Sequence, residues 1–155
     1  MTKAELTVAI EQELTPLTRV SEVVVQLLEA AGQDLRPWHA AAGAKYVADL
    51  FMGLENLCGR RYAALGRERP KGPDSHRRVL EEFLATDDLG ASLTPELTDR
   101  LRKYLRFRHR FTHGYGYEVA WELVEEPLRL LPETVQVLGQ HWRDWLQALP
   151  DSDVR

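Results

Sequence analysis

The chain of 155 residues has a single cysteine, Cys58, which excludes a disulfide framework, and its apolar neighbours predict a buried thiol. No apolar run approaches the roughly 20 residues that a membrane-spanning helix needs. The polar residues that follow Met1 argue against a signal peptide. Neither an H-E-x-x-H element nor a close group of carboxylates accompanies the histidines, so we predict no metal and no other cofactor. These absences favour a cytoplasmic protein with no membrane segment.

Charge is divided unevenly along the chain, although the net charge is only −4. Residues 60–110 hold 13 Lys or Arg against 8 Asp or Glu, and the remainder holds 7 against 16. Such a division can present a basic surface to a polyanion and an acidic surface elsewhere, although solvated helix faces would give the same count. With 44% apolar residues, the length suits one domain with a core, over residues 1–155.

Apolar residues recur at helical spacing almost throughout, and no run of alternating β-branched residues predicts a strand. The first helix is predicted over Thr2–Ala31, with Pro16 either kinking it or beginning its second part, and with Gly32 ending it. A second helix is predicted from about Pro37 to Leu65, with Gly66 as its cap.

The later elements follow the same logic. Thr94, Pro95 and Glu96 form a start signal, with a capping hydroxyl, a proline in the first turn and an early acid. We expect the last helical stretch to be interrupted at Pro127 and restarted at Pro132. In order, the segments are a loop over 67–75, a short helix over 76–85, a loop over 87–93, a helix from 94 to Gly114 and a helical stretch over 118–149. The sequence therefore predicts an all-α, up-and-down bundle of about four to five helices.

The segment from Arg108 to Tyr115 reads R-x-x-x-x-H-x-Y, without an acidic residue, where a basic helix meets two glycines. Arg108 can hold two phosphate oxygens, and His113 can move protons near neutral pH. Residues five apart lie about 140° apart on a helix, so these two converge only if the helix ends between them. Gly114 and Gly116 tolerate the positive φ that such a turn needs. On spacing alone, a solvated helix end with a capping His113 explains the pattern as well.

Other polar and aromatic residues have plainer interpretations. Glu55 lies within an apolar helical face, which predicts burial and a basic partner from the motif helix. His39 and His141 are interpreted as ordinary surface or interface histidines. The four tryptophans favour core or dimer-interface packing over base stacking: Trp38, Trp121, Trp142 and Trp145.

The order of these segments resembles the HepT-like toxins of the HEPN superfamily. Residues 105–118 resemble the junction in that family where the motif ends one long helix and precedes another. Residues 46–56 resemble its middle helix, and residues 70–80 resemble the loop and short helix of one HepT-like branch. The similarity spans roughly residues 35–149.

The resemblance implies a HEPN-like helical bundle that forms a homodimer and brings two motif copies to one cleft. It implies a metal-independent endoribonuclease, with RNA as substrate and with Arg108 and His113 as the catalytic pair. It also implies an MntA-like nucleotidyltransferase as antitoxin, which in some systems adds AMP to the motif tyrosine, here Tyr115.

One departure keeps other functions open. Many HEPN proteins have Asn or Asp directly after the arginine, where this chain has His109, which becomes an auxiliary motif residue. The first alternative is a non-catalytic HEPN module that binds RNA or nucleotide, or docks a nucleotidyltransferase; the second is a helical adaptor for an acidic protein. The candidate RNA contacts are Arg106, Arg110, Lys71 and His76.

Overall fold

The computed structural model describes residues 1–85 and 93–151, so the predicted loop over 87–93 lies, apart from Leu93, outside the described residues. Within these ranges the secondary structure is helical and contains no strand, which confirms the all-α prediction. The elements are α1 (Lys3–Gln33), α2 (Pro37–Ala64), α3 (Ser75–Leu84), α4 (Pro95–Thr112), the 3₁₀ turn η2 (Gly116–Glu118) and α5 (Trp121–Ala148).

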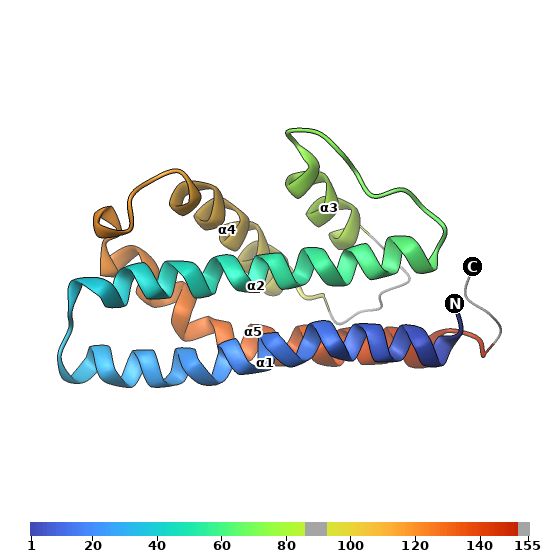
Figure 1. Cartoon of the computed structure of the whole chain (residues 1–155), viewed down its shortest axis with the longest axis horizontal. Coiled ribbons are helices and arrows are strands. Elements are labelled where there is room, and N and C mark those ends of the chain that lie inside the picture. The colour runs from blue at the N-terminus through green and yellow to red at the C-terminus, as the bar shows by residue number, and fades with distance from the viewer. Residues whose placement is uncertain (86–92, 152–155) are drawn as a thin grey trace.

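Helix α2 is the centre of the arrangement. It contacts α1, α5, α3, α4 and η2, whereas α1 contacts mainly α2 and α5. Figure 1 shows α3 and α4 together on the side of α2 that faces away from α1. The bundle therefore has a long layer of α1, α2 and α5, and a shorter layer of α3 and α4 that carries the motif.

Local signals explain most helix boundaries. At the start of α1, Thr2 and Glu5 form a capping box, in which Glu5 N–H donates to Thr2 Oγ1 at 3.2 Å. The helix runs unbroken through Pro16 and ends one residue beyond Gly32, at Gln33. Gly66 follows the last turn of α2 with φ of 62°, which confirms its predicted role in ending that helix.

Two glycines allow α2 to lie close to its neighbours. A Cβ atom at Gly43 would stand 2.5 Å from Leu128 Cδ1 and 2.8 Å from Val124 Cγ1, both on α5. A Cβ atom at Gly53 would stand 2.5 Å from Leu17 Cδ2 on α1. The missing side chains let branched residues of α1 and α5 pack directly against the α2 backbone.

The predicted break in the last helical stretch is wrong. Helix α5 is continuous, with Pro127 and Pro132 both inside it. Side chains satisfy carbonyl groups in this stretch: Tyr104 Oη donates to Pro127 O at 2.9 Å, and Thr134 Oγ1 donates to Leu130 O at 2.7 Å. Packing against α1 and α2 outweighs the local cost of each proline.

The aromatic core confirms some side-chain predictions and corrects others. Trp142 and Trp145 are buried, and Phe83 of α3 stacks on Trp142 with a centroid distance of 5.6 Å. Trp38 is 63% exposed, so the prediction of core packing does not extend to it.

The interpretation of His39 and His141 as surface or interface histidines is also wrong, because both are buried. The Nδ1 atom of His39 accepts a hydrogen bond of 2.8 Å from the N–H of Arg36, the residue that precedes α2. This bond gives a partner to a backbone N–H at the start of the helix and holds the imidazole inward.

Cys58 is buried, as predicted, and burial raises the pKa of its thiol to about 12. The thiol therefore stays protonated near neutral pH and behaves as a small apolar group.

Candidate functional site

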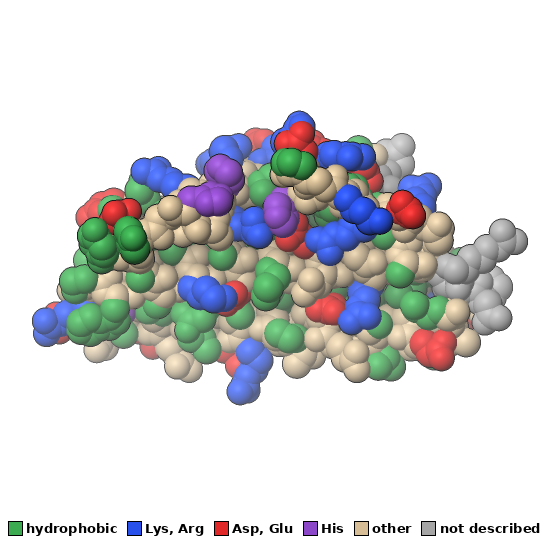
Figure 2. Space-filling model, turned by 45° about the horizontal axis from the view of Figure 1, so that its top comes forward, with side chains coloured by type: hydrophobic (Ala, Val, Ile, Leu, Met, Phe, Trp, Pro, Cys, Tyr) green, Lys and Arg blue, Asp and Glu red, His purple; other side chains and the backbone are tan. Residues whose placement is uncertain are grey.

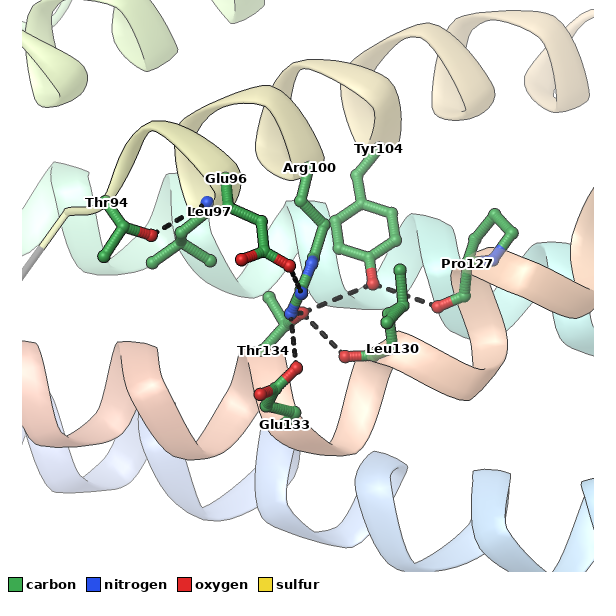
Figure 3. A network of polar contacts seen from close by, with 9 residues as sticks. All are labelled: Thr94, Glu96, Leu97, Arg100, Tyr104, Pro127, Leu130, Glu133 and Thr134. Atoms are coloured by element: carbon green, nitrogen blue, oxygen red, sulfur yellow. Dashed lines mark hydrogen bonds and ion pairs between the residues drawn. The ribbon is translucent and has the colours of Figure 1, made fainter.

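Helix α4 presents the motif, and its first half is fixed by polar contacts. At its start, Leu97 N–H donates to Thr94 Oγ1 at 3.2 Å, as the start signal predicted. One turn later, Arg100 Nη2 lies 3.3 Å from Glu96 Oε1, and Arg100 Nη1 lies 3.0 Å from Glu133 Oε2 on α5. Figure 3 shows these residues converging between the two helices.

A buried tyrosine continues this connection. The Oη of Tyr104 donates to the carbonyl of Pro127 and lies 3.4 Å from Thr134 Oγ1 (Figure 3). Burial raises the pKa of Tyr104 to about 12, so the phenol keeps the proton that it donates. Together with Arg100, this contact sets the position of α4 on α5, within the two turns before the motif.

At the end of α4, the side chain of Thr112 forms hydrogen bonds with the backbone of the last turn. The hydroxyl of Thr112 donates to the carbonyl of Arg108 at 2.8 Å and to the carbonyl of His109 at 3.2 Å. His113 follows as the cap residue, still with right-handed backbone angles (φ −107°, ψ 0°). The carbonyl of His109, one of the last four of the helix, thereby gains a partner within the motif.

His113 therefore lies over His109 and not over Arg108. The two imidazole rings are 5.0 Å apart, edge to face, as neighbours four residues apart on a helix are. The expected turn through Gly114 and Gly116 is wrong, because the glycines with positive φ in the described residues are Gly66 and Gly72. Without a left-handed turn, nothing bends His113 back across the helix end.

The side chain of Arg108 projects from α4 in a different direction from the two histidines. It lies two turns after Leu101, so the two side chains point within about 20° of the same direction. Leu101 is buried, so Arg108 points toward the interior side of α4. Arg108 is itself partly buried. The structure records no hydrogen bond or ion pair of the Arg108 side chain within residues 1–85 and 93–151, and none between it and His113. In one chain the two predicted catalytic residues are therefore not brought together.

The histidines face the side of α4 that meets α3. Arg102 of α4 pairs with Glu81 of α3 through two contacts of 2.9 and 3.1 Å. His109 follows Arg102 by two turns and so leaves the helix in nearly the same direction. Figure 2 shows histidine side chains gathered among Lys and Arg side chains on this face of the molecule.

Tyr115 and Tyr117 form an exposed aromatic pair beside the histidines. Their rings stack with centroids 5.9 Å apart and planes 16° apart, and the side chains are 72% and 82% exposed. Between them, Gly116 lies against α2, where an added Cβ would be 3.4 Å from the Cβ of Ala41. The side chain of Tyr115 is therefore exposed at the start of a short turn.

A groove of about 490 Å³ runs between α4 and α5, on the other side of α4 from α3. Arg106 and Arg110, two of the candidate RNA contacts, border it together with Lys103. Within the described part of the chain these three cations have no ion pair, unlike Arg100 and Arg102. Glu122 and Glu126 of α5 line the same groove, so its charge is mixed.

A second polar cluster centres on Glu55, whose side chain is only 7% exposed. Its Oε1 is hydrogen-bonded to Nδ1 of His76 and lies 3.8 Å from Nη2 of Arg69. The predicted partner from the motif helix is therefore wrong, because the basic residues come from the 65–74 segment and from the start of α3. The other candidate contact of that region, Lys71, is exposed.

Two residues near the motif and in the Glu55 cluster, Tyr117 and Arg69, are not among the candidates predicted from the sequence. Tyr117 is marked in the sequence by its Y-G-Y spacing from Tyr115, a signal that favours side-by-side rings on a short turn. Arg69 carries no such signal, because its approach to Glu55 depends on how the 65–74 segment folds back over α2.

Among residues 1–85 and 93–151, none of the helices could span a membrane. In the same ranges, no three His, Cys, Asp or Glu side chains are grouped as a metal site requires.

A family model described as HepT-like protein matches residues 42–149, which includes α4, η2 and the motif. No curated protein and no solved structure matches the chain.

Proposed function

The chain belongs to the HepT-like family, and from this membership we propose that it is an RNA-cleaving toxin of a toxin–antitoxin pair. The proposed reaction is endonucleolytic cleavage of an RNA phosphodiester without a metal ion. One observation carries the proposal: the R-x-x-x-x-H-x-Y motif lies within the matched residues, at a helix end where both histidines and Tyr115 are exposed.

Arg108 and His113 supply the chemistry of the proposed reaction. The guanidinium of Arg108 stabilises the charge that develops on the phosphate oxygens in the transition state. Protonated His113 gives a proton to the leaving 5′-oxygen. The neighbouring His109, with its ring 5.0 Å from that of His113, is a second titrating group at the same end.

Two copies of the chain complete the proposed site. Within one chain Arg108 and His113 point in directions about 140° apart. A homodimer with two motifs in one cleft places Arg108 of one copy opposite His113 of the other, as the family resemblance implies. Tyr115, which is 72% exposed, is the proposed AMP acceptor for an MntA-like nucleotidyltransferase antitoxin.

The proposed RNA contacts are Lys71, Arg106 and Arg110, three cations that have no ion pair among the described residues. Each phosphate that they neutralise releases counterions, so RNA affinity falls steeply as salt rises. Replacing one of them with alanine lowers the slope of log affinity against log salt by about one.

A non-catalytic HEPN module is the second candidate. The observation that favours it is that Arg108 and His113 do not converge within one chain, and His109 replaces the usual Asn or Asp. Such a module would bind RNA or dock the nucleotidyltransferase and would leave the phosphodiester intact.

The test is cleavage of a mixed cellular RNA pool in excess EDTA by the wild type and by Arg108→Ala and His113→Ala. Arg19→Ala is the matched control, because Arg19 is an exposed arginine of α1, away from the motif and from the Glu55 cluster. Unfolding temperature and oligomeric state are measured for all four proteins first, so that only folded and equally assembled variants are compared.

We expect cutting by the wild type and the Arg19 variant, and a loss of at least about 100-fold in the two motif variants. Equal inactivity of all four proteins would support the non-catalytic module. Equal cutting by all four would show that the motif does not carry the activity.

A further inference from the structure

Glu55 and His76 form a carboxylate–imidazole pair that the Arg108–His113 chemistry does not use. Glu55 projects from α2 and is buried, while the imidazole of His76 is 40% exposed. Burying a carboxylate is costly without a partner, and the Nδ1 atom of His76 supplies one, with Arg69 at 3.8 Å as a second.

This hydrogen bond determines which nitrogen of His76 faces outward. A carboxylate accepts, so neutral His76 donates from Nδ1 and carries its lone pair on Nε2. Nε2 has no hydrogen-bond partner among the described residues. The same division of roles makes histidine a general base in hydrolytic triads, where the carboxylate holds the tautomer and the ring takes the proton.

The pair lies on the face that carries the motif histidines. Helices α3 and α4 are in contact and are joined by the Arg102–Glu81 pair, and His109 leaves α4 in nearly the same direction as Arg102. His76 begins α3, and in Figure 1 the start of α3 and the end of α4 lie on the same side of α2. An RNA strand bound along this face meets both.

We propose that His76, held by Glu55, is the general base of the RNA cleavage, with His113 as the general acid. The proposal rests on the proposed ribonuclease function. One imidazole cannot be the deprotonated base and the protonated acid in the same step, so cleavage requires two proton-transfer groups.

The step balances with these two groups. Nε2 of His76 takes the proton from a ribose 2′-hydroxyl, and the 2′-oxygen forms a bond to phosphorus. The bond between phosphorus and the 5′-oxygen breaks, and that oxygen takes the proton of His113. The products are a 2′,3′-cyclic phosphate and a 5′-hydroxyl, and solvent exchange restores both imidazoles.

His76→Asn is the decisive variant. The Asn amide keeps an N–H donor near the position of Nδ1, so Glu55 stays paired, but it has no group at the position of Nε2. His76→Gln is made in parallel as a second side chain that can donate to Glu55. We expect unfolding temperatures close to the wild type and cleavage rates lowered by about 100-fold or more.

A substrate with a better leaving group separates the two roles. The probe is an RNA oligonucleotide with sulfur in place of the bridging 5′-oxygen at the position that the wild type cuts. A thiolate leaves without a proton, so this probe restores the rate of His113→Ala but leaves His76→Asn and His76→Gln slow.

The outcomes distinguish this proposal from the proposed function. If the wild type cuts RNA and His113→Ala does not, but the folded His76 variants cut at the wild-type rate, the base lies elsewhere and this inference is overturned. The same holds if the sulfur probe restores the His76 variants as fully as His113→Ala. A wild type that cuts no RNA contradicts the ribonuclease proposal itself.

Discussion

The hydroxyl of Tyr104 on α4 donates a hydrogen bond of 2.9 Å to the carbonyl of Pro127 on α5, in a region closed to water. The phenol is buried, so it needs a hydrogen-bond partner, and the longer contact of 3.4 Å to Thr134 Oγ1 is its other one. This contact joins α4, the helix that carries the motif, to the C-terminal helix α5.

Tyr104→Phe removes this bond and the longer contact with Thr134 Oγ1. We expect the free energy of unfolding to fall by about 0.5–1.5 kcal/mol, the net contribution of a typical hydrogen bond. Urea denaturation measures the change, and Tyr117→Phe is the control, because that phenol is 82% exposed and its loss has no such cost. Equal stability of the two variants would mean that the Tyr104 bond contributes nothing.

Gly43→Ala forces α2 away from α5, because the new Cβ would lie 2.5 Å from Leu128 Cδ1. We expect a loss of about 1–3 kcal/mol in unfolding free energy. Gly32→Ala is the matched control, since a Cβ there meets nothing within 4 Å and alanine favours the helix. Thermal unfolding of the pair should move in opposite directions; a stabilised Gly43→Ala protein would contradict the close packing described here.

Cys58 should resist thiol reagents in the folded protein. Burial raises the pKa of its thiol to about 12, so almost no thiolate is present at pH 8. Labelling with a chromogenic disulfide reagent is expected to be slow until guanidinium unfolds the chain and then to reach one thiol per chain. Fast labelling under native conditions would show that the α2 face around Cys58 opens readily.

His141 makes folding sensitive to mild acid. Burial lowers the pKa of His141 from 6.5 to about 4, so between these values the unfolded chain binds a proton that the folded chain does not. The unfolding free energy is therefore unaffected by His141 above pH 6.5. It falls as the pH drops from 6.5 toward 4, by up to about 3 kcal/mol.

The measurement is the unfolding free energy of the wild type and of His141→Gln at steps between pH 7 and pH 4. The variant should show the shallower decline, because Gln does not titrate. Parallel curves for the two proteins would show that His141 takes up its proton in the folded state as readily as in the unfolded chain.

The fold was predictable where local chemistry decides it. Thr94 and Gly66 mark helix boundaries through a capping hydroxyl and a left-handed backbone, and both work without help from the rest of the chain. Pro127 and Pro132 misled the prediction because packing against the rest of the bundle maintains a helix that the local sequence disfavours.

The geometry of the candidate site was not predictable from the sequence, and the roles of its residues stay predictions. The motif identifies His113, yet its neighbour is His109, because the glycines that follow do not turn the chain back. Glu55 was recognised as a buried acid, but its partner His76 comes from a helix whose approach only the tertiary structure defines. Contacts between distant segments carry no local sequence signal.

The polar contacts of α4 are concentrated in its first half. Arg100, Arg102 and Tyr104 tie that half to α5 and α3, whereas the side chains of the last turn from His109 onward make no ion pair within the described residues. Amide hydrogens in the first half should then exchange with solvent only when the whole chain unfolds. Those near His113 should exchange through local opening, which needs a smaller free energy. The end of α4 that carries the motif can therefore change its conformation while the bundle beneath it stays folded.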